Sequence, residues 1–229
     1  SLLYPREYNQ LNVGGTVTLM EAMRDVGVRR VVFISSGAIY GNQAVQPVAE
    51  NATPEPRSPY AVSKLAGEYY VRTIGQLWGI ETVVLRVFNA YGPGQHLPPV
   101  HAPVIPAFLR QARLNGTLVI HGDGQQSRDY VYLEDVVSGM VAAATNPAAI
   151  GQIINLGSGQ ETTVRELAKL AVLVSGGKPE VVYNPRTERG PDRMCADLSL
   201  AQQVLNYQPQ VSLLDGLQLT LEKDPRLTS

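Results

Sequence analysis

A tyrosine and a lysine that could move protons together lie four positions apart, at Tyr60 and Lys64. Ser58 is a suitable helix N-cap and Pro59 a suitable first helical residue, so we expect the pair one turn apart on the same helical face. A phenol has a pKa of about 10, so a tyrosine acting as a base near neutral pH needs a nearby cation to stabilise its anion. Lys64 would supply that cation, and one substrate could meet both side chains.

Tyrosine and lysine at this spacing are also ordinary on amphipathic helices, so the surrounding elements must support a catalytic interpretation. Residues 30–36 predict a buried parallel strand that ends in hydroxyl side chains, and residues 81–89 predict a second strand that ends in Asn89. Active sites of open α/β sheets lie at the carboxyl ends of strands, where Ser36 and Asn89 would both lie. Ser36 could then hydrogen-bond the same substrate hydroxyl as Tyr60.

The composition excludes several other classes of protein. The 229 residues are 44% hydrophobic with a formal net charge of −1, which suffices for a sizeable core and does not indicate a nucleic-acid partner. No hydrophobic stretch reaches membrane-spanning length and the N-terminus lacks the layout of a signal peptide, so the cytoplasm is the expected location. Cys195 alone cannot form an intramolecular disulfide and is interpreted as an inert packing residue, while His96, His101 and His121 have no ligand spacing, so no metal site is predicted.

Six segments of the sequence carry a likeness that extends over nearly the whole chain. They are residues 12–16 at the start of a helix, 35–41, 60–64, 86–93, 122–131 and 155–159. In content and order they resemble the extended short-chain dehydrogenase/reductase family, specifically its NAD-dependent sugar epimerase/dehydratase group, of which UDP-glucose 4-epimerase is a familiar member.

The resemblance implies an α/β fold, namely a Rossmann-like doubly wound parallel sheet missing its first strands, with a smaller C-terminal substrate domain. Residues 1–102 are expected to form a partial dinucleotide-binding domain. Residues 103–229 are expected to form mainly a nucleotide-sugar substrate domain, with some segments returning to the sheet.

One family signature has no match in this sequence. Family members open with a strand, a glycine-rich phosphate turn and a helix, so the sequence is interpreted as part of a longer enzyme. Residues 157–162 could be offered as a substitute phosphate turn, but Thr163 and Glu166 have the pattern of a capping box and predict a helix start.

The resemblance also implies the cofactor and the catalytic residues. The cofactor would be NAD, and the catalytic residues would be Ser36, Tyr60 and Lys64. The implied cofactor-binding set is Asn12, Ser35, Tyr60, Lys64 and the backbone of Phe88. Tyr60 phenolate would remove the proton of the sugar 4-hydroxyl while C4 gives hydride to NAD, and the hydride would return to the other face of the 4-keto sugar. Lys64 would lower the pKa of Tyr60 and hold the nicotinamide ribose.

Substrate contacts are expected mainly from the second half of the chain. Arg128 matches a family arginine that clamps the nucleotide diphosphate, a role suited to a planar cation with several donors, although it could instead pair with Asp123 or Asp129. The other implied contacts are Asn89 on a phosphate, the Val119 backbone and His121 on the base, and Arg193 or Arg189 as a second phosphate anchor. His121 could equally be a plain edge residue, and the local spacing favours Arg193 over Arg189.

The loop after Ser36 narrows the predicted reaction. Family dehydratases and UDP-glucuronate decarboxylases have a carboxylate there as an additional acid or base, whereas this chain has Gly37 and Ala38. We therefore predict an NAD-dependent nucleotide-sugar 4-epimerase of the UDP-glucose 4-epimerase type. The alternatives are a nucleotide-sugar 4-ketoreductase, and a truncated non-catalytic paralogue that acts as an oligomerisation or binding module.

A dimer is implied by the resemblance rather than by the residues. A helix is predicted over residues 9–25 and ends at Gly27. Its apolar positions include Leu11, Leu19, Ala22 and Met23. In the family this helix and the tyrosine-bearing helix, here residues 59–78, tend to build a dimer interface, so a homodimer through these helices is expected.

Overall fold

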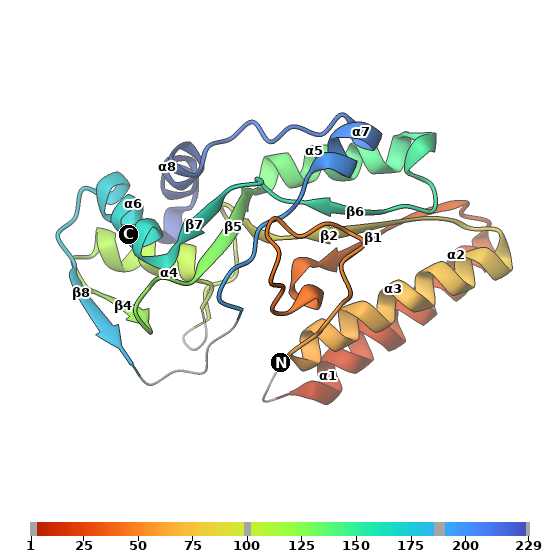
Figure 1. Cartoon of the computed structure of the whole chain (residues 1–229), viewed down its shortest axis with the longest axis horizontal. Coiled ribbons are helices and arrows are strands. Elements are labelled where there is room, and N and C mark those ends of the chain that lie inside the picture. Colours follow the sequence, from red (N-terminus) through yellow and green to blue (C-terminus); the bar gives the residue numbers. More distant parts are fainter. Residues whose placement is uncertain (1–3, 99–101, 186–190, 228–229) are drawn as a thin grey trace.

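The first part of the molecule is built on a parallel sheet with helices on both faces. The computed structural model describes residues 4–98, 102–185 and 191–227. The strands of this sheet are, in spatial order, β1 (Arg30–Ser36), β2 (Glu81–Val87) and β6 (Ile153–Leu156). Two helices, α2 (Gly15–Val26) and α3 (Pro59–Trp78), cover one face, and α5 (Leu133–Thr145) and α7 (Ser199–Leu205) cover the other (Figure 1).

Alternation along β1 explains how both faces of the sheet are buried. Val31 and Phe33 pack against the α2 and α3 layer, whereas Val32 and Ile34 pack with the core that includes α5. A glycine lets α3 approach the sheet closely, because a Cβ at Gly67 would lie 2.6 Å from the Phe33 ring. The side chains of α3 are thereby brought directly onto the sheet.

The remaining strands form two smaller sheets. One consists of β3 (Asn89–Tyr91), β5 (Ser127–Tyr132) and β7 (Glu161–Thr163), and the other pairs β4 (Thr117–His121) with β8 (Glu180–Asn184) in parallel. The short turn η3 (Pro147–Ala149) follows α5 and packs in the core of the first sheet. The helices that accompany the two smaller sheets are α4 (Val104–Arg113), α6 (Val164–Ser175) and α8 (Leu213–Lys223), with the short turn η4 (Pro225–Leu227). A core that includes Phe108, Tyr132, Leu167 and Leu217 joins these elements. The chain returns to the first sheet through α5, β6 and α7, and the domain boundary at residue 102 stays a prediction.

The local capping signals of the sequence are present in the structure. Ser58 Oγ accepts a hydrogen bond from the Ala61 N–H at 3.1 Å, and Pro59 opens α3. Thr163 and Glu166 form a reciprocal capping box at the start of α6. These predictions are confirmed.

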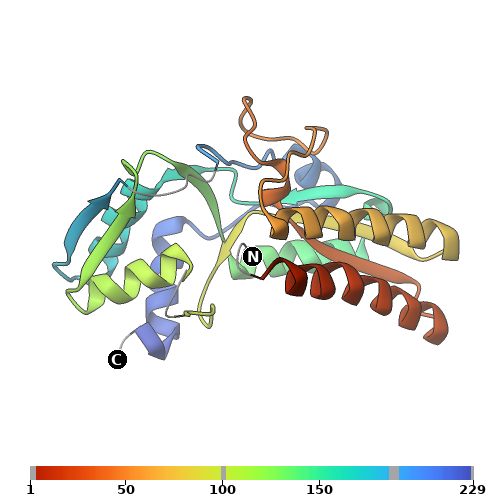
Figure 2. The same cartoon turned by 90° about the horizontal axis from the view of Figure 1, so that it is seen from below.

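Two predicted boundaries were wrong. The helix predicted over residues 9–25 begins at Pro5 and runs through α1 (Pro5–Asn9), a π-helical turn η1 (Gln10–Gly14) and α2, beside α3 (Figure 2). The strand predicted over residues 81–89 ends at Val87, because the chain then crosses to the next sheet, where Asn89 begins β3.

The predicted fold class is confirmed, since parallel sheets and helices form an α/β architecture of the doubly wound type. A 3₁₀ turn, η2 (Gly37–Tyr40), follows the carboxyl end of β1. Among the helices of the described residues, none has the length and apolar character needed to cross a membrane.

Candidate active site

Ser36, Tyr60 and Lys64 come together where the carboxyl end of β1 meets the first turns of α3. Ser36 Oγ caps turn η2 by accepting a hydrogen bond from the Ala38 N–H at 3.2 Å. A side-chain hydrogen bond joins Ser36 and Tyr60. Lys64 lies one turn after Tyr60, and its Nζ donates to the carbonyl oxygen of Ile34 at 2.9 Å. The three residues that the sequence nominates for catalysis therefore share one site.

Burial governs the proton affinities of the phenol and the amine. Burial raises the pKa of Tyr60, and the neighbouring Tyr8 adds to this rise. The hydrogen bond with Ser36 lowers the pKa of Tyr60 and so opposes the rise. The rings of Tyr8 and Tyr60 meet edge to face with centroids 5.9 Å apart. Burial also lowers the pKa of Lys64. The effect of Lys64 on the pKa of Tyr60 stays a prediction.

A buried polar network lies directly behind this site. Of its members, only Ser35 had been predicted from the sequence to have a role. Glu68 of α3 accepts two hydrogen bonds from Arg86 of β2, at 3.1 Å to Oε1 and 2.9 Å to Oε2, and a third from Ser35 Oγ at 2.5 Å. Arg86 also donates to the Tyr40 hydroxyl at 2.9 Å, and that hydroxyl donates to Asn155 Oδ1 at 2.8 Å. The network joins α3, η2 and all three strands of the sheet.

The other residues expected to hold the cofactor lie around the same strand ends. Asn12 belongs to the π-helical turn η1, and its Nδ2 donates to Ser63 Oγ of α3 at 2.9 Å. The Ser35 hydroxyl is bonded within the buried network. Phe88 is buried, and its N–H donates to the carbonyl oxygen of Leu156 at 2.8 Å. Ser35 and Phe88 thus have partners inside the protein, and their contact with a cofactor stays a prediction.

Asn89 lies beside a buried carboxylate that organises the neighbouring loops. Its Nδ2 donates to the main-chain carbonyl of Asp129 at 3.1 Å. The fully buried Asp129 carboxylate accepts hydrogen bonds from the Ser158 N–H and Oγ, both at 2.6 Å, from the Gly159 N–H at 3.0 Å and from the Ala196 N–H at 3.1 Å. Burial raises the pKa of Asp129, and these hydrogen bonds act against that rise. Asp129 therefore ties strand β5 to the loop after β6 and to the segment before α7.

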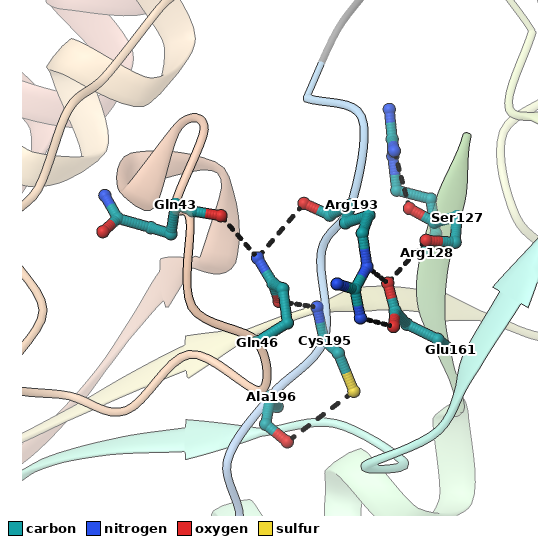
Figure 3. Close-up of polar contacts among 8 residues, drawn as sticks. All are labelled: Gln43, Gln46, Ser127, Arg128, Glu161, Arg193, Cys195 and Ala196. Atoms are coloured by element: carbon teal, nitrogen blue, oxygen red, sulfur yellow. Dashed lines mark hydrogen bonds and ion pairs between the residues drawn. The ribbon is translucent and has the colours of Figure 1, made fainter. Parts of the chain in front are cut away.

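Arg128 is a largely buried cation held by main-chain oxygens. Its Nη1 donates to the carbonyl groups of Ser127 and Pro191, both at 2.7 Å. Neither Asp123 nor Asp129, the partners considered from sequence, forms an ion pair with it, and burial lowers its pKa. In Figure 3 the Arg128 side chain extends away from the carboxylate of Glu161.

Arg193 has a different partner. It forms a two-pronged ion pair with Glu161, at 2.9 Å from Nε and 2.5 Å from Nη2, and Ser127 Oγ donates to the same carboxylate at 2.6 Å (Figure 3). The hydrogen bonds from Arg193 lower the pKa of Glu161. The role of Arg193 on a phosphate stays a prediction, and Arg189 lies outside the described residues.

The residues expected at the base lie on the outer side of β4. Val119 and His121 are exposed, while Leu118 and Ile120, which alternate with them, are buried. Their contact with a nucleotide base stays a prediction.

Elsewhere, burial raises the pKa of Cys195 to about 12, in keeping with an unreactive packing residue.

The sequence model of the NAD dependent epimerase/dehydratase family matches residues 1–157, a range that contains Ser36, Tyr60 and Lys64. The chain belongs to this family. UDP-glucose 4-epimerase of Mycolicibacterium smegmatis is 39% identical over 213 residues, which cover 93% of this chain and 67% of that protein. The chain spans 65% to 67% of the length of the three curated relatives matched first, about two thirds.

Solved structures of family members have the same fold. The UDP-glucose 4-epimerase of Thermotoga maritima, solved with UDP-glucose, has a TM-score of 0.92 and 35% identity, over 97% of this chain and 72% of that one. The UDP-glucuronic acid 4-epimerase of Bacillus cereus, in complex with UDP-glucuronic acid and NAD, has a TM-score of 0.85 and 32% identity, over 92% of this chain and 66% of that one. The predicted family is confirmed, and NAD is the cofactor of that family.

The donor set at the candidate site fits part of a nicotinamide dinucleotide. Ser36 and Tyr60 offer hydroxyls, and the Lys64 ammonium has N–H donors beyond the one that binds Ile34. In the described ranges no carboxylate lies within ion-pair distance of Lys64. Hydroxyl and ammonium donors without a competing anion suit a ribose and a carboxamide.

Proposed function

We propose that this chain contains the proton-transfer site of a nucleotide-sugar 4-epimerase that acts with NAD on a UDP-glucose-like substrate. The observation that carries this proposal is the meeting of Ser36, Tyr60 and Lys64 at one strand end. The turn after Ser36 contains Gly37 and Ala38 and so supplies no carboxylate for dehydration or decarboxylation. Relatives named as 4-epimerases of UDP-sugars support the same reaction.

The proposed mechanism gives each residue of the site one task. Tyr60, as phenolate, takes the proton of the sugar 4-hydroxyl and later returns it, while Ser36 orients that hydroxyl by a hydrogen bond. The Lys64 ammonium favours the phenolate and donates to the nicotinamide ribose. When bound, NAD would supply hydride acceptance and return at C4.

Substrate binding is assigned to the C-terminal part of the chain. Arg128 is the cation proposed for the diphosphate, because its guanidinium has donors left over and forms no ion pair with a carboxylate of the described residues. Asn89 lies on the neighbouring strand β3, in register with Tyr130 of β5. We assign Val119 and His121 to the base side, and Arg193 to the diphosphate after it leaves Glu161.

Two measurements on the purified protein test the function. Calorimetry should detect NAD binding, and UDP-glucose should be converted to its 4-epimer without net reduction of NAD. A 4-ketoreductase would consume reduced cofactor in proportion to product, and a non-catalytic module would show neither binding nor turnover. Because the chain spans about two thirds of its relatives, any further residues that its gene encodes should be included in a parallel preparation.

We also propose a homodimer through the outer face of α1, η1, α2 and α3, whose helices lie side by side in Figure 2. Of the predicted apolar positions only Met23 is buried, and Leu11, Leu19 and Ala22 are exposed. The exposed apolar side chains of this face include Leu11, Leu19, Val62, Tyr69 and Leu77, with Leu11 75% and Leu77 73% exposed. Exposed apolar side chains gathered on neighbouring helices are typical of a protein interface. Leu77→Lys should convert a dimer to a monomer in sedimentation velocity, whereas a monomeric wild type would contradict the proposal. The cytoplasm remains the expected location.

A further inference from the structure

A row of polar side chains crosses the sheet behind the proposed catalytic residues. The strand register pairs Ser35 with Arg86 and Arg86 with Asn155, so these residues occupy one level of three adjacent strands. Glu68 from α3 and Tyr40 from η2 contact the row from the same side. Glu68 is 2% and Arg86 4% exposed, so this is a buried ion pair within a bonded network.

Four of the five N–H donors of the Arg86 guanidinium are bonded in this network. Nε and Nη2 bind the two oxygens of Glu68, and Nη1 binds the Tyr40 hydroxyl at 2.9 Å and the Glu50 carbonyl at 3.1 Å. The guanidinium also lies over the Tyr40 ring, 4.9 Å from its centroid. Extensive hydrogen bonding of this kind is what a buried ion pair requires, because an unpaired charge in the interior is strongly disfavoured.

A second cation, Lys64, lies close enough to Glu68 in the sequence to form an ion pair with it. Lys64 precedes Glu68 by four residues, a helical spacing at which lysine and glutamate commonly attract each other. In this structure Lys64 Nζ instead donates to the Ile34 carbonyl and lies 5.5 Å from the centroid of the Phe33 ring. Arg86, not Lys64, holds the carboxylate of Glu68.

We infer that Arg86 is a positioning residue of the proton-transfer site: it keeps Glu68 away from Lys64, so that Lys64 stays the free cation one turn from Tyr60. Through Tyr40 it also fixes the end of the turn that begins after Ser36. The inference rests on the proposed roles of Tyr60 and Lys64. It adds that a residue of β2, which touches neither substrate nor cofactor in the proposed mechanism, sets the charge next to the base.

Few groups act on the Tyr60 phenol. They are the Tyr8 phenol from α1 and the Ser36 hydroxyl at the end of β1, and Lys64 lies one turn further along the same helix as Tyr60. Burial raises the pKa of Tyr60. In the proposed mechanism the Lys64 ammonium is the cation that offsets this rise. If Glu68 paired with Lys64, the phenolate would lose its stabilisation.

The test is a pH titration of Tyr60 in the protein without cofactor or sugar. Carbon-13 NMR of ring-labelled tyrosine monitors the titration, and the Tyr60→Phe variant identifies the Tyr60 signal. Arg86→Met should raise the pKa of Tyr60 by about one pH unit, because the released carboxylate neutralises Lys64. The double variant Arg86→Met with Glu68→Gln should return the pKa to the wild-type value. General loosening of the fold would affect the single and double variants alike.

Each outcome decides the question. If Arg86→Met does not fold, Arg86→Gln takes its place, because glutamine keeps hydrogen-bond donors but has no charge to hold the Glu68 carboxylate. A folded variant of either kind with an unchanged Tyr60 pKa would overturn the inference, as would a double variant that stays raised. The titration needs neither NAD nor substrate. Its result can therefore be interpreted even if the epimerase assay fails.

Discussion

The two halves of the proposed active site are built in different ways. In the cofactor-side site, defined by Ser36, Tyr60 and Lys64, polar side chains bond to one another or to a strand carbonyl, and a buried ion pair supports them. In the nucleotide-side site, defined by Asn89, Arg128 and Arg193, the side chains bond main-chain oxygens or one partly exposed carboxylate.

The difference indicates how each half would work. Proton transfer needs groups held in place before the substrate arrives, because preorganised geometry and charge lower the barrier. Phosphate binding needs donors that can face the phosphate, and Arg193 would have to give up Glu161 to take part. The cofactor-side site is therefore preformed, whereas the nucleotide-side site is expected to rearrange when the sugar nucleotide binds.

The largest expected effect comes from removing the Tyr60 hydroxyl in the cofactor-side site. Tyr60→Phe should lower epimerase turnover roughly 10²-fold to 10⁴-fold, the usual contribution of a positioned acid or base, with little change in thermal unfolding. Initial rates of 4-epimer formation measure this. Tyr4→Phe, at an exposed position, is the matched control and should keep full activity. A Tyr60→Phe enzyme within threefold of wild type would remove the proton-transfer role from this site.

A smaller effect is expected in the nucleotide-side site. Arg128→Met should weaken UDP binding roughly tenfold to a hundredfold, because a charge-assisted hydrogen bond is worth about 1.5 to 3 kcal/mol. Calorimetry with UDP alone isolates this contact from the chemistry. Arg113→Met is the control, since Arg113 also donates to a main-chain carbonyl, that of Ser175, but lies on α4 and has no proposed role.

A second UDP-binding measurement tests whether the ion pair with Glu161 keeps Arg193 from binding the diphosphate. Glu161→Gln weakens the ion pair that occupies Arg193, so UDP should bind as tightly as in wild type or somewhat more tightly. Weaker binding in this variant would mean that Glu161 itself supports the nucleotide-side site, and the contrast between a preformed and a rearranging half would fail.

Local signals in the sequence predicted that Ser36, Tyr60 and Lys64 would lie together. The N-cap at Ser58 and the four-residue spacing of Tyr60 and Lys64 fixed which side chains share a helical face, and the apolar strand before Ser36 fixed where that face would meet the sheet. Both patterns act over a few residues, so a single sequence contains them.

Long-range pairings were not predictable in the same way. Arg86 meets Glu68 and Asn155 only through strand register and helix packing, which join segments far apart in the chain. Alternation along β2 was the one available signal, because it separates Arg86 from the α5-side residues Leu85 and Val87. The pairing of Arg193 with Glu161 likewise depends on how the segment before α7 passes β7, which no local pattern specifies.

The smallest effect concerns how the nucleotide-side part is attached. Asp224 follows α8, accepts a hydrogen bond from the Gly94 N–H at 2.9 Å and pairs with Arg226, and thereby links α8 to the segment that follows β3. Hydrogen bonds from Arg226 lower the pKa of Asp224 to about 2. Because a carboxyl pKa lowered by folding stabilises the protein only above the ordinary value near 4, this contribution is lost as the pH falls towards about 2.

Asp224→Asn should therefore reduce the free energy of unfolding near neutral pH by about 1 to 2 kcal/mol, a value that allows for the solvent exposure of Arg226. The difference from wild type should shrink once the pH falls below about 4, and urea unfolding at a series of pH values measures it. Asp25→Asn, in the exposed pair with Arg24, is the control and should change stability little at any pH. A pH-independent loss in Asp224→Asn would mean that the side chain acts by packing rather than by charge. The nucleotide-side part would then be attached by packing and not by this electrostatic link.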